Sequence, residues 1–145
     1  MIKSINHTGV VVQNLDRSVE FYRDIVGLEV ITQLDRQGDT VSQVVGYDNT
    51  HLKAALLRAM NGQVLELVQF LQPQPGQRPT EERAVLGVSH LAFDVDNIDE
   101  TLCHLVEHGA IKMNDPVEVA PGKKVCYFQD PDGNWLELIE DRSSL

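Results

Sequence analysis

Four side chains, His7, Glu66, His90 and Glu137, occupy equivalent places in two copies of one sequence pattern. Imidazole nitrogens and carboxylate oxygens are common protein ligands for divalent transition metals. With two of each, an ion that prefers six ligands keeps about two positions for water or for adjacent oxygens of a substrate. The four residues therefore predict a divalent metal site that activates a small molecule.

The repeat is visible in the spacing of each copy. Asn14 follows His7 by seven residues, and Asn97 follows His90 by the same interval. Each copy continues through an amphipathic segment to a glycine, and ends in an apolar run that contains one glutamate, at residues 64–68 and 135–139. Two unrelated segments that each satisfied only their own packing would not be expected to share this spacing, so we interpret the chain as a duplication.

Hydrophobic periodicity assigns the same elements to both copies. Each has a strand, then a helix that an Asn caps and a glycine ends, then three strands. The sequence thus predicts an α+β protein of two βαβββ modules, about residues 4–71 and 87–140, joined by a proline-rich linker at 72–86. We take residues 1–145 as one domain, and interpret the polar stretch 35–49 as a substrate-facing loop. The predicted strands are 10–12, 29–34, 52–58, 63–71, 91–95, 111–113, 124–129 and 135–139.

The two glutamates lie inside apolar strands. Alternate residues of a strand share a face, so Glu66 shares its face with Val64 and Val68, and Glu137 shares its face with Ile139. A charged carboxylate there is unfavourable unless it is paired, protonated or bound to a cation. Because no lysine or arginine lies nearby in either strand, a metal ion is the cation that we expect.

Composition limits the class of partner. The formal net charge is −10 over 145 residues, with no basic run, which argues against nucleic acid and against an anionic membrane surface. No stretch approaches the roughly 18 apolar residues of a membrane span, and no signal peptide is visible, so we expect a cytoplasmic protein that binds a small molecule. Cys103 and Cys126 lack ligand spacing, and we expect both to be buried thiols.

The duplicated pattern resembles the vicinal oxygen chelate (VOC) superfamily, which includes glyoxalase I and methylmalonyl-CoA epimerase. The resemblance covers both repeats and the strand-turn-strand segment 122–138. It implies a cup-shaped mixed sheet around a divalent metal, with His7, Glu66, His90 and Glu137 as the metal ligands. This His-Glu-His-Glu set is similar to that of glyoxalase I. Zn, Ni, Co, Mn and Fe(II) are all compatible with these ligands.

The resemblance implies a metal-dependent lyase, isomerase or epimerase of the glyoxalase type. Its substrate would be a small molecule with adjacent oxygens, and its reaction a proton transfer next to a metal-chelated carbonyl. Either Glu137 or Glu66 is the catalytic base, and the sequence does not separate them. We expect a homodimer, in which each metal is held within one chain or shared between two.

Two alternatives remain at this point. An extradiol-type Fe(II) dioxygenase would use His7, His90 and Glu137, with Tyr127 as an acid in the pocket, but it would leave Glu66 as a surplus carboxylate. A binding protein of the antibiotic-sequestering type would keep the fold without the chemistry, and the intact ligand set argues against it.

Overall fold

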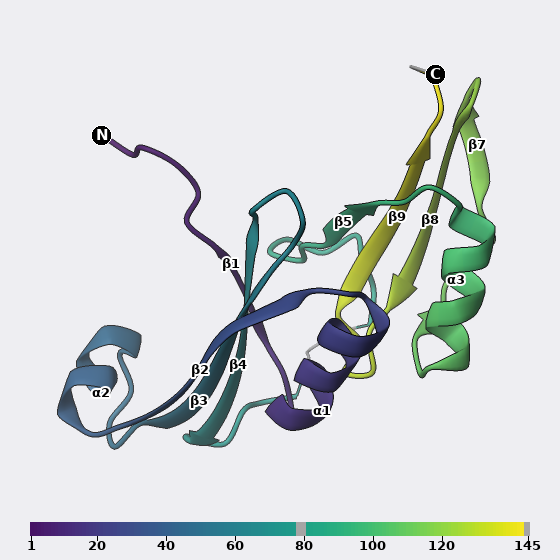
Figure 1. The fold of residues 1–145 in the computed structure, drawn as a ribbon. Coiled ribbons are helices and arrows are strands. Elements are labelled where there is room, and N and C mark those ends of the chain that lie inside the picture. The colour runs from purple at the N-terminus through teal and green to yellow at the C-terminus, as the bar shows by residue number, and fades with distance from the viewer. Residues whose placement is uncertain (78–80, 144–145) are drawn as a thin grey trace. The chain divides into compact units, whose positions relative to one another are not determined.

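The computed structural model describes residues 1–77 and 81–143. The chain divides into two compact units, of which unit 1 ends and unit 2 begins within the undescribed residues 78–80. Part of the predicted linker, residues 78–80, lies outside the described residues. Unit 1 contains β1 (Thr8–Val11), α1 (Leu15–Glu20), the π-helical turn η1 (Phe21–Ile25), β2 (Glu29–Gln37), α2 (Asp39–Val45), β3 (His51–Arg58) and β4 (Val64–Gln72) (Figure 1). Unit 2 contains β5 (Leu91–Asp94), α3 (Ile98–Glu107), β6 (Ile111–Lys112), β7 (Val117–Ala120), β8 (Lys123–Gln129) and β9 (Trp135–Asp141).

Unit 1 forms one open mixed sheet with the strand order β1-β4-β3-β2. β1 runs parallel to β4, and the other neighbours are antiparallel. Helix α1 packs on β3 and β4, and the side chains that it covers, such as Leu65 and Leu67 on β4, are buried. Glu66 alternates with these leucines, so it lies on the opposite face of β4.

Unit 2 repeats this plan with the order β5-β9-β8-β6. β5 is parallel to β9, β8 is antiparallel to β9, and α3 packs on β8 and β9. Leu136 and Leu138 are buried on β9, while Glu137 between them is only half-buried. The predicted α+β class is confirmed, with one open mixed sheet in each unit. The assignment of the whole chain to one domain stays a prediction.

The helix boundaries follow the predicted capping residues. The side-chain oxygen of Asn14 accepts from the backbone N–H of Arg17 at 3.0 Å, and that of Asn97 accepts from the N–H of Glu100 at 3.1 Å. Gly27 and Gly109, which follow the helices, have φ of +89° and +99°. These left-handed conformations strain any residue with a Cβ atom, which explains glycine at both places.

The structure adds one strand that the sequence did not predict. β6 and β7 both pair with β8, so they are two pieces of one edge strand, whereas the corresponding β2 is continuous. The interruption contains Asn114 and Pro116. The side-chain oxygen of Asn114 accepts from the N–H of Tyr127 at 3.0 Å in place of a ladder carbonyl, and Pro116 has no N–H to donate.

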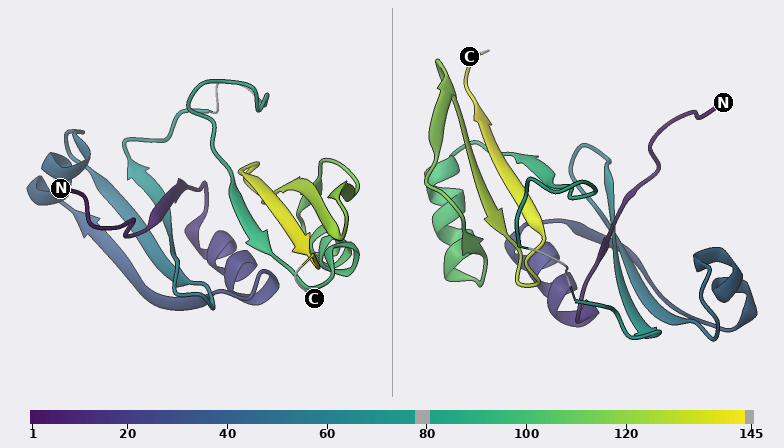
Figure 2. Two further views of the ribbon diagram at one scale, coloured as in Figure 1. Left: turned by 90° about the horizontal axis from the view of Figure 1, so that it is seen from above. Right: turned by 180° about the vertical axis from the view of Figure 1, so that it is seen from behind.

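The stretch at residues 35–49 contains the end of β2 and the helix α2 as well as loop, which corrects the interpretation of it as a loop alone. α2 stands at the end of the hairpin that β2 and β3 form (Figure 2). Ser42 connects this helix to the residue before β3, because its hydroxyl oxygen accepts from the N–H of Thr50 at 2.9 Å. In the part of the chain that the structure describes, no helix is long and apolar enough to cross a membrane.

Candidate metal centre

His7 and Glu66 form a pair within unit 1. In the parallel ladder of β1 and β4, Gly9 lies opposite Glu66, and His7 precedes Gly9 by two residues, so all three share one face. The His7 Nε2 atom is 3.3 Å from Oε2 of Glu66. The imidazole is 39% exposed and the carboxylate 26% exposed, so solvent and small ligands reach the pair.

His90 and Glu137 form the corresponding pair within unit 2. Ala92 lies opposite Glu137 in the ladder of β5 and β9, and His90 again precedes the opposing residue by two. The His90 Nε2 atom is 3.1 Å from Oε2 of Glu137, whose side chain is 15% exposed. The two repeats therefore hold their His and Glu in the same register and through the same pair of atoms.

A small residue opposite each glutamate makes room for this arrangement. A Cβ atom at Gly9 would lie 3.5 Å from Oε2 of Glu66, which is ordinary contact. The corresponding residue of unit 2, Ala92, carries such a Cβ opposite Glu137. Sequence reasoning missed these two positions, although a small residue two places after each histidine was the available signal.

Each glutamate-bearing strand also holds the helix of its own unit. The side-chain oxygen of Gln69, three residues after Glu66, accepts from the N–H of Leu15 at 2.9 Å. Glu140, three residues after Glu137, accepts from the N–H of Ile98 at 2.8 Å. In both units this bond ties the first N–H of the helix to the strand that carries the candidate ligand, which positions that strand in the core.

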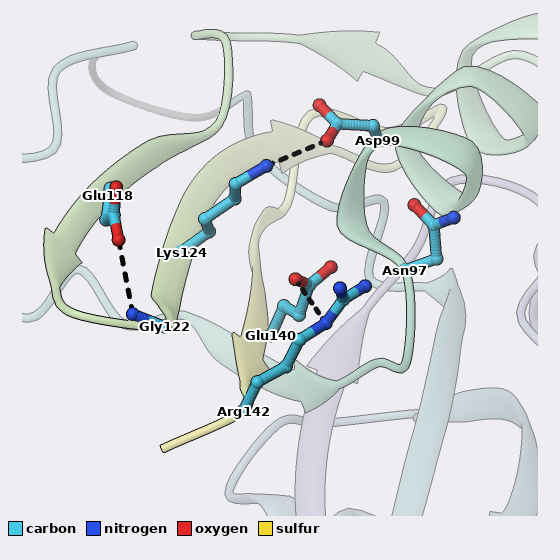
Figure 3. Close-up of a pocket in the computed structure, with 7 residues that line it drawn as sticks. All are labelled: Asn97, Asp99, Glu118, Gly122, Lys124, Glu140 and Arg142. Carbon is cyan, nitrogen blue, oxygen red and sulfur yellow. Dashed lines mark hydrogen bonds and ion pairs between the residues drawn. The ribbon is translucent and has the colours of Figure 1, made fainter. Parts of the chain in front are cut away.

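Glu140 also belongs to a hollow at the start of α3, shown in Figure 3. Its side chain is 6% exposed and accepts from Nε of Arg142 at 2.9 Å, while Lys124 pairs with Asp99 at 3.1 Å. These four charges neutralise one another in pairs, and the remaining carboxylate of the lining, Glu118, accepts from the N–H of Gly122 at 3.1 Å. We therefore interpret the hollow as a structural feature of the helix start.

The His7 ring makes one hydrogen bond that bears on its tautomer. Its Nδ1 atom is 2.8 Å from the side-chain oxygen of Asn6, and because that oxygen accepts, Nδ1 donates its proton. In a neutral imidazole the lone pair is then on Nε2, the atom that faces Glu66. Hydrogen bonds of this kind hold metal-binding histidines in one tautomer.

The separations within the pairs fit a shared ion. Two ligands at about 2.1 Å from one metal and about 90° apart lie about 3.0 Å from each other; the observed separations are 3.3 and 3.1 Å. Within the described residues, each carboxylate has its histidine as its ion-pair partner, and neither contacts a lysine or arginine. The same residues contain no group of three or more His, Cys, Asp or Glu side chains placed to hold a metal. Convergence of both pairs on one ion stays a prediction.

The two cysteines differ in exposure. Cys126 is buried in β8, and this burial raises the pKa of its thiol to about 11. Cys103 is exposed, so the prediction that it is buried was wrong. It follows Leu102 on α3, and because the buried side chains of that helix are Ile98, Leu102 and Leu105, position 103 turns toward solvent.

Comparison with known sequences identifies the family. The profile of the Glyoxalase/Bleomycin resistance protein/Dioxygenase superfamily matches residues 4–138, and the chain belongs to this superfamily. It is 34% identical over 140 residues to the uncharacterized protein YaeR of Escherichia coli (strain K12), a match that covers 96% of this chain and 97% of that protein. It is 27% identical over 143 residues to lactoylglutathione lyase of Schizosaccharomyces pombe, covering 93% of this chain and 46% of that enzyme.

A solved structure has the same fold. A glyoxalase family protein from Bacillus cereus superposes with a TM-score of 0.89 and 25% identity, covering 97% of this chain and 95% of that protein. The predicted resemblance to the VOC superfamily is therefore confirmed. Members of this superfamily use divalent metals.

Proposed function

We propose that the protein is a divalent-metal-dependent lyase, isomerase or epimerase of the glyoxalase type, which moves a proton next to a carbonyl of a small molecule. The observation that carries the proposal is the repeated His-Glu pair, in one register and with one atom pair in both units. His7, Glu66, His90 and Glu137 would hold the ion. The match to lactoylglutathione lyase supports the same class of reaction.

The chain itself supplies the base. When bound, the divalent ion would supply Lewis acidity to the carbonyl oxygen and so make the neighbouring C–H more acidic. The carboxylate of Glu66 or Glu137 takes that proton. In an isomerisation it returns a proton to the adjacent carbon, while the hydroxyl proton of the deprotonated carbon moves to the former carbonyl oxygen. In an epimerisation the other glutamate would deliver a proton to the opposite face of the same carbon. In both cases the proton held by a carboxylate exchanges with solvent water, which restores the starting protonation. No oxidant is consumed, and the base ends in its starting state.

The surroundings of the two carboxylates suit this role. Each lies on the face of its strand opposite the helix, half-buried and open to a ligand. In both pairs the histidine Nε2 lies 3.1–3.3 Å from Oε2 of its glutamate, and an ion shared by these two atoms would limit the positions that the carboxylate adopts. A base held in this way is positioned before the substrate arrives.

The test begins with elemental analysis of protein purified without a histidine tag. A set of 2-oxo and 2-hydroxy carbonyl compounds is then incubated with the protein in deuterium oxide, and incorporation is followed by NMR. We expect deuterium at the carbon next to a carbonyl. Glu66→Gln and Glu137→Gln keep the side-chain shape, and the variant that lacks the base should lose on the order of 10²–10⁴ in exchange rate.

Glu29→Gln is the matched control, because it removes an exposed carboxylate that pairs with Arg58 away from the candidate ligands. It should exchange at the wild-type rate. If Glu66→Gln and Glu137→Gln both exchange deuterium at the wild-type rate, neither glutamate is the base and the proposal is wrong. Oxygen consumption with a catechol would instead favour the dioxygenase, and ligand binding without exchange would favour the binding protein.

A further inference from the structure

Arg83 in unit 2 lies against two aromatic rings. Its guanidinium carbon is 4.4 Å from the ring centroid of Tyr127 on β8 and 4.8 Å from that of Trp135 on β9. The rings are 6.5 Å apart and nearly perpendicular. Contacts of this kind between a cation and ring faces are favourable, and two rings together restrict where the guanidinium lies.

This cation lies beside one of the candidate metal ligands. The ring of His90 meets that of Tyr127 edge to face, with centroids 5.3 Å apart. Tyr127 is also opposite Glu137 in the ladder of β8 and β9. A hollow of about 300 Å³ is lined by Arg83, His90, Tyr127 and Trp135, with Ala84, Val88 and Ser89. This volume is at the lower end of small-molecule sites.

Within the described residues, the Arg83 guanidinium donates no hydrogen bond. Arg23 and Arg58 each lie against a carboxylate, that of Asp24 or Glu29. The contacts of Arg83 within the described residues are those with the two rings, and no carboxylate neutralises it there. In a chain with a net charge of −10, acidic groups to pair with it are abundant. Arg83 lies beside a candidate active site and has no carboxylate partner among the described residues. It is therefore suited to bind an anionic ligand.

We propose that Arg83 determines substrate specificity by binding a carboxylate or phosphate group of the substrate in this hollow. This specificity role rests on the function proposed above. It limits the substrate of that reaction to an anionic small molecule. Its carbonyl end would face His90 and Glu137, and its anionic end would face Arg83.

The chemistry of the two rings favours arginine over lysine. The two rings contact the guanidinium at 4.4 and 4.8 Å, and within the described residues its N–H groups stay available for two parallel hydrogen bonds to an anion. The rings also restrict the side chain before the anion arrives, which lowers the entropic cost of binding. A lysine ammonium at this position would supply charge without the paired geometry.

Trp135 makes a direct test available, because it is the only tryptophan of the chain. Its fluorescence in metal-free protein is followed during titration with succinate, with inorganic phosphate and, as the uncharged control, with dimethyl succinate, all at constant ionic strength. We expect a saturable change with at least one of the two anions and none with the diester. Comparison of the two anions separates a carboxylate site from a phosphate site.

Three variants complete the test. Arg83→Gln should weaken binding by about ten- to a hundredfold, and Arg83→Lys should lie between it and the wild type. Arg23→Gln makes the same charge change at an exposed arginine that pairs with Asp24, so it should bind like the wild type. Because Arg83 is exposed, its variants should fold, which circular dichroism checks.

The inference is overturned if neither anion gives a saturable change, if Arg83→Gln binds as tightly as the wild type, or if the diester gives the same response. These readouts need neither metal nor turnover, so they stand even if the proposed proton transfer fails. If turnover is found, Arg83→Gln should raise KM for anionic substrates and leave kcat and uncharged substrates unchanged. An equal loss for both kinds of substrate would refute the specificity role and leave the proton transfer intact.

Discussion

Substitutions of Gly9 should affect metal affinity and folding stability independently. An added Cβ would be 3.5 Å from Oε2 of Glu66, which is ordinary contact, and no positive φ opposes a side chain there. Gly9→Ala reproduces what unit 2 already has, because Ala92 occupies the corresponding place opposite Glu137. We expect Gly9→Ala to keep its metal affinity and to gain about 0.5–1 kcal/mol of stability, since glycine within a strand is unfavourable by that amount.

Gly9→Val should behave differently. Its two methyl groups extend about 1.5 Å beyond Cβ, into a space where carbon and oxygen need about 3.5 Å. The carboxylate of Glu66 must then move by about an ångström from its place beside His7. Displacements of ligands and their supports cost roughly 10–100-fold in metal affinity, while valine itself is favourable in a strand. Affinity should therefore fall without loss of stability.

Calorimetric titration with Co²⁺ or Ni²⁺ measures the affinity, and urea unfolding of the metal-free protein measures the stability. Ala92→Gly and Ala92→Val are the matched variants of unit 2, and the duplication requires that Ala92→Val lose affinity as Gly9→Val does. The reasoning fails if Gly9→Val binds metal as tightly as the wild type, or if Gly9→Ala loses as much affinity as Gly9→Val.

Two further predictions concern the thiol in the core and the assembly. Burial raises the pKa of Cys126 from 9.0 to about 11, so its stabilising effect is complete below pH 9 and is lost as the pH rises to 11. Urea unfolding of the wild type should show a decrease of roughly 2–3 kcal/mol over that range, and Cys126→Ala should lack this component; parallel pH curves would contradict it. We expect a homodimer, which sedimentation giving a 16.2 kDa monomer at micromolar concentration would contradict. If each metal site is shared between subunits, mixing His7→Ala chains with Glu137→Ala chains restores metal binding to half of the sites in the mixed dimer, whereas sites within one chain stay defective.

Much of the framework is readable from the sequence because it depends on local rules. The Asn caps before α1 and α3 and the glycines after the helices are local signals, and the structure has them where predicted. The alternation along β4 and β9 separates Glu66 and Glu137 from the leucines of the core. These features follow from the periods of helix and strand alone.

The features that the sequence did not reveal depend on contacts between distant residues. Arg83 is more than 40 residues from Tyr127 in the chain, and only the pairing of β8 with β9 places both rings beneath it. The effect that we predict for Gly9 depends on its place opposite Glu66. β7 was missed because Pro116 marks a break, and the return of the chain to β8 after it has no local signal.

The interruption between β6 and β7 has a consequence for how the protein behaves at high concentration. A long, flat edge strand offers its free N–H and C=O groups to other chains and so promotes aggregation. The outer edge of the unit 2 sheet is divided by Asn114 and Pro116 into pieces of two and four residues. Val117 and Val119 of β7 are 53% and 55% exposed, so a continuous strand here would present apolar side chains along with free backbone groups. Because of the break, this edge is too short for a strand of another copy of the chain to pair along it and extend the sheet.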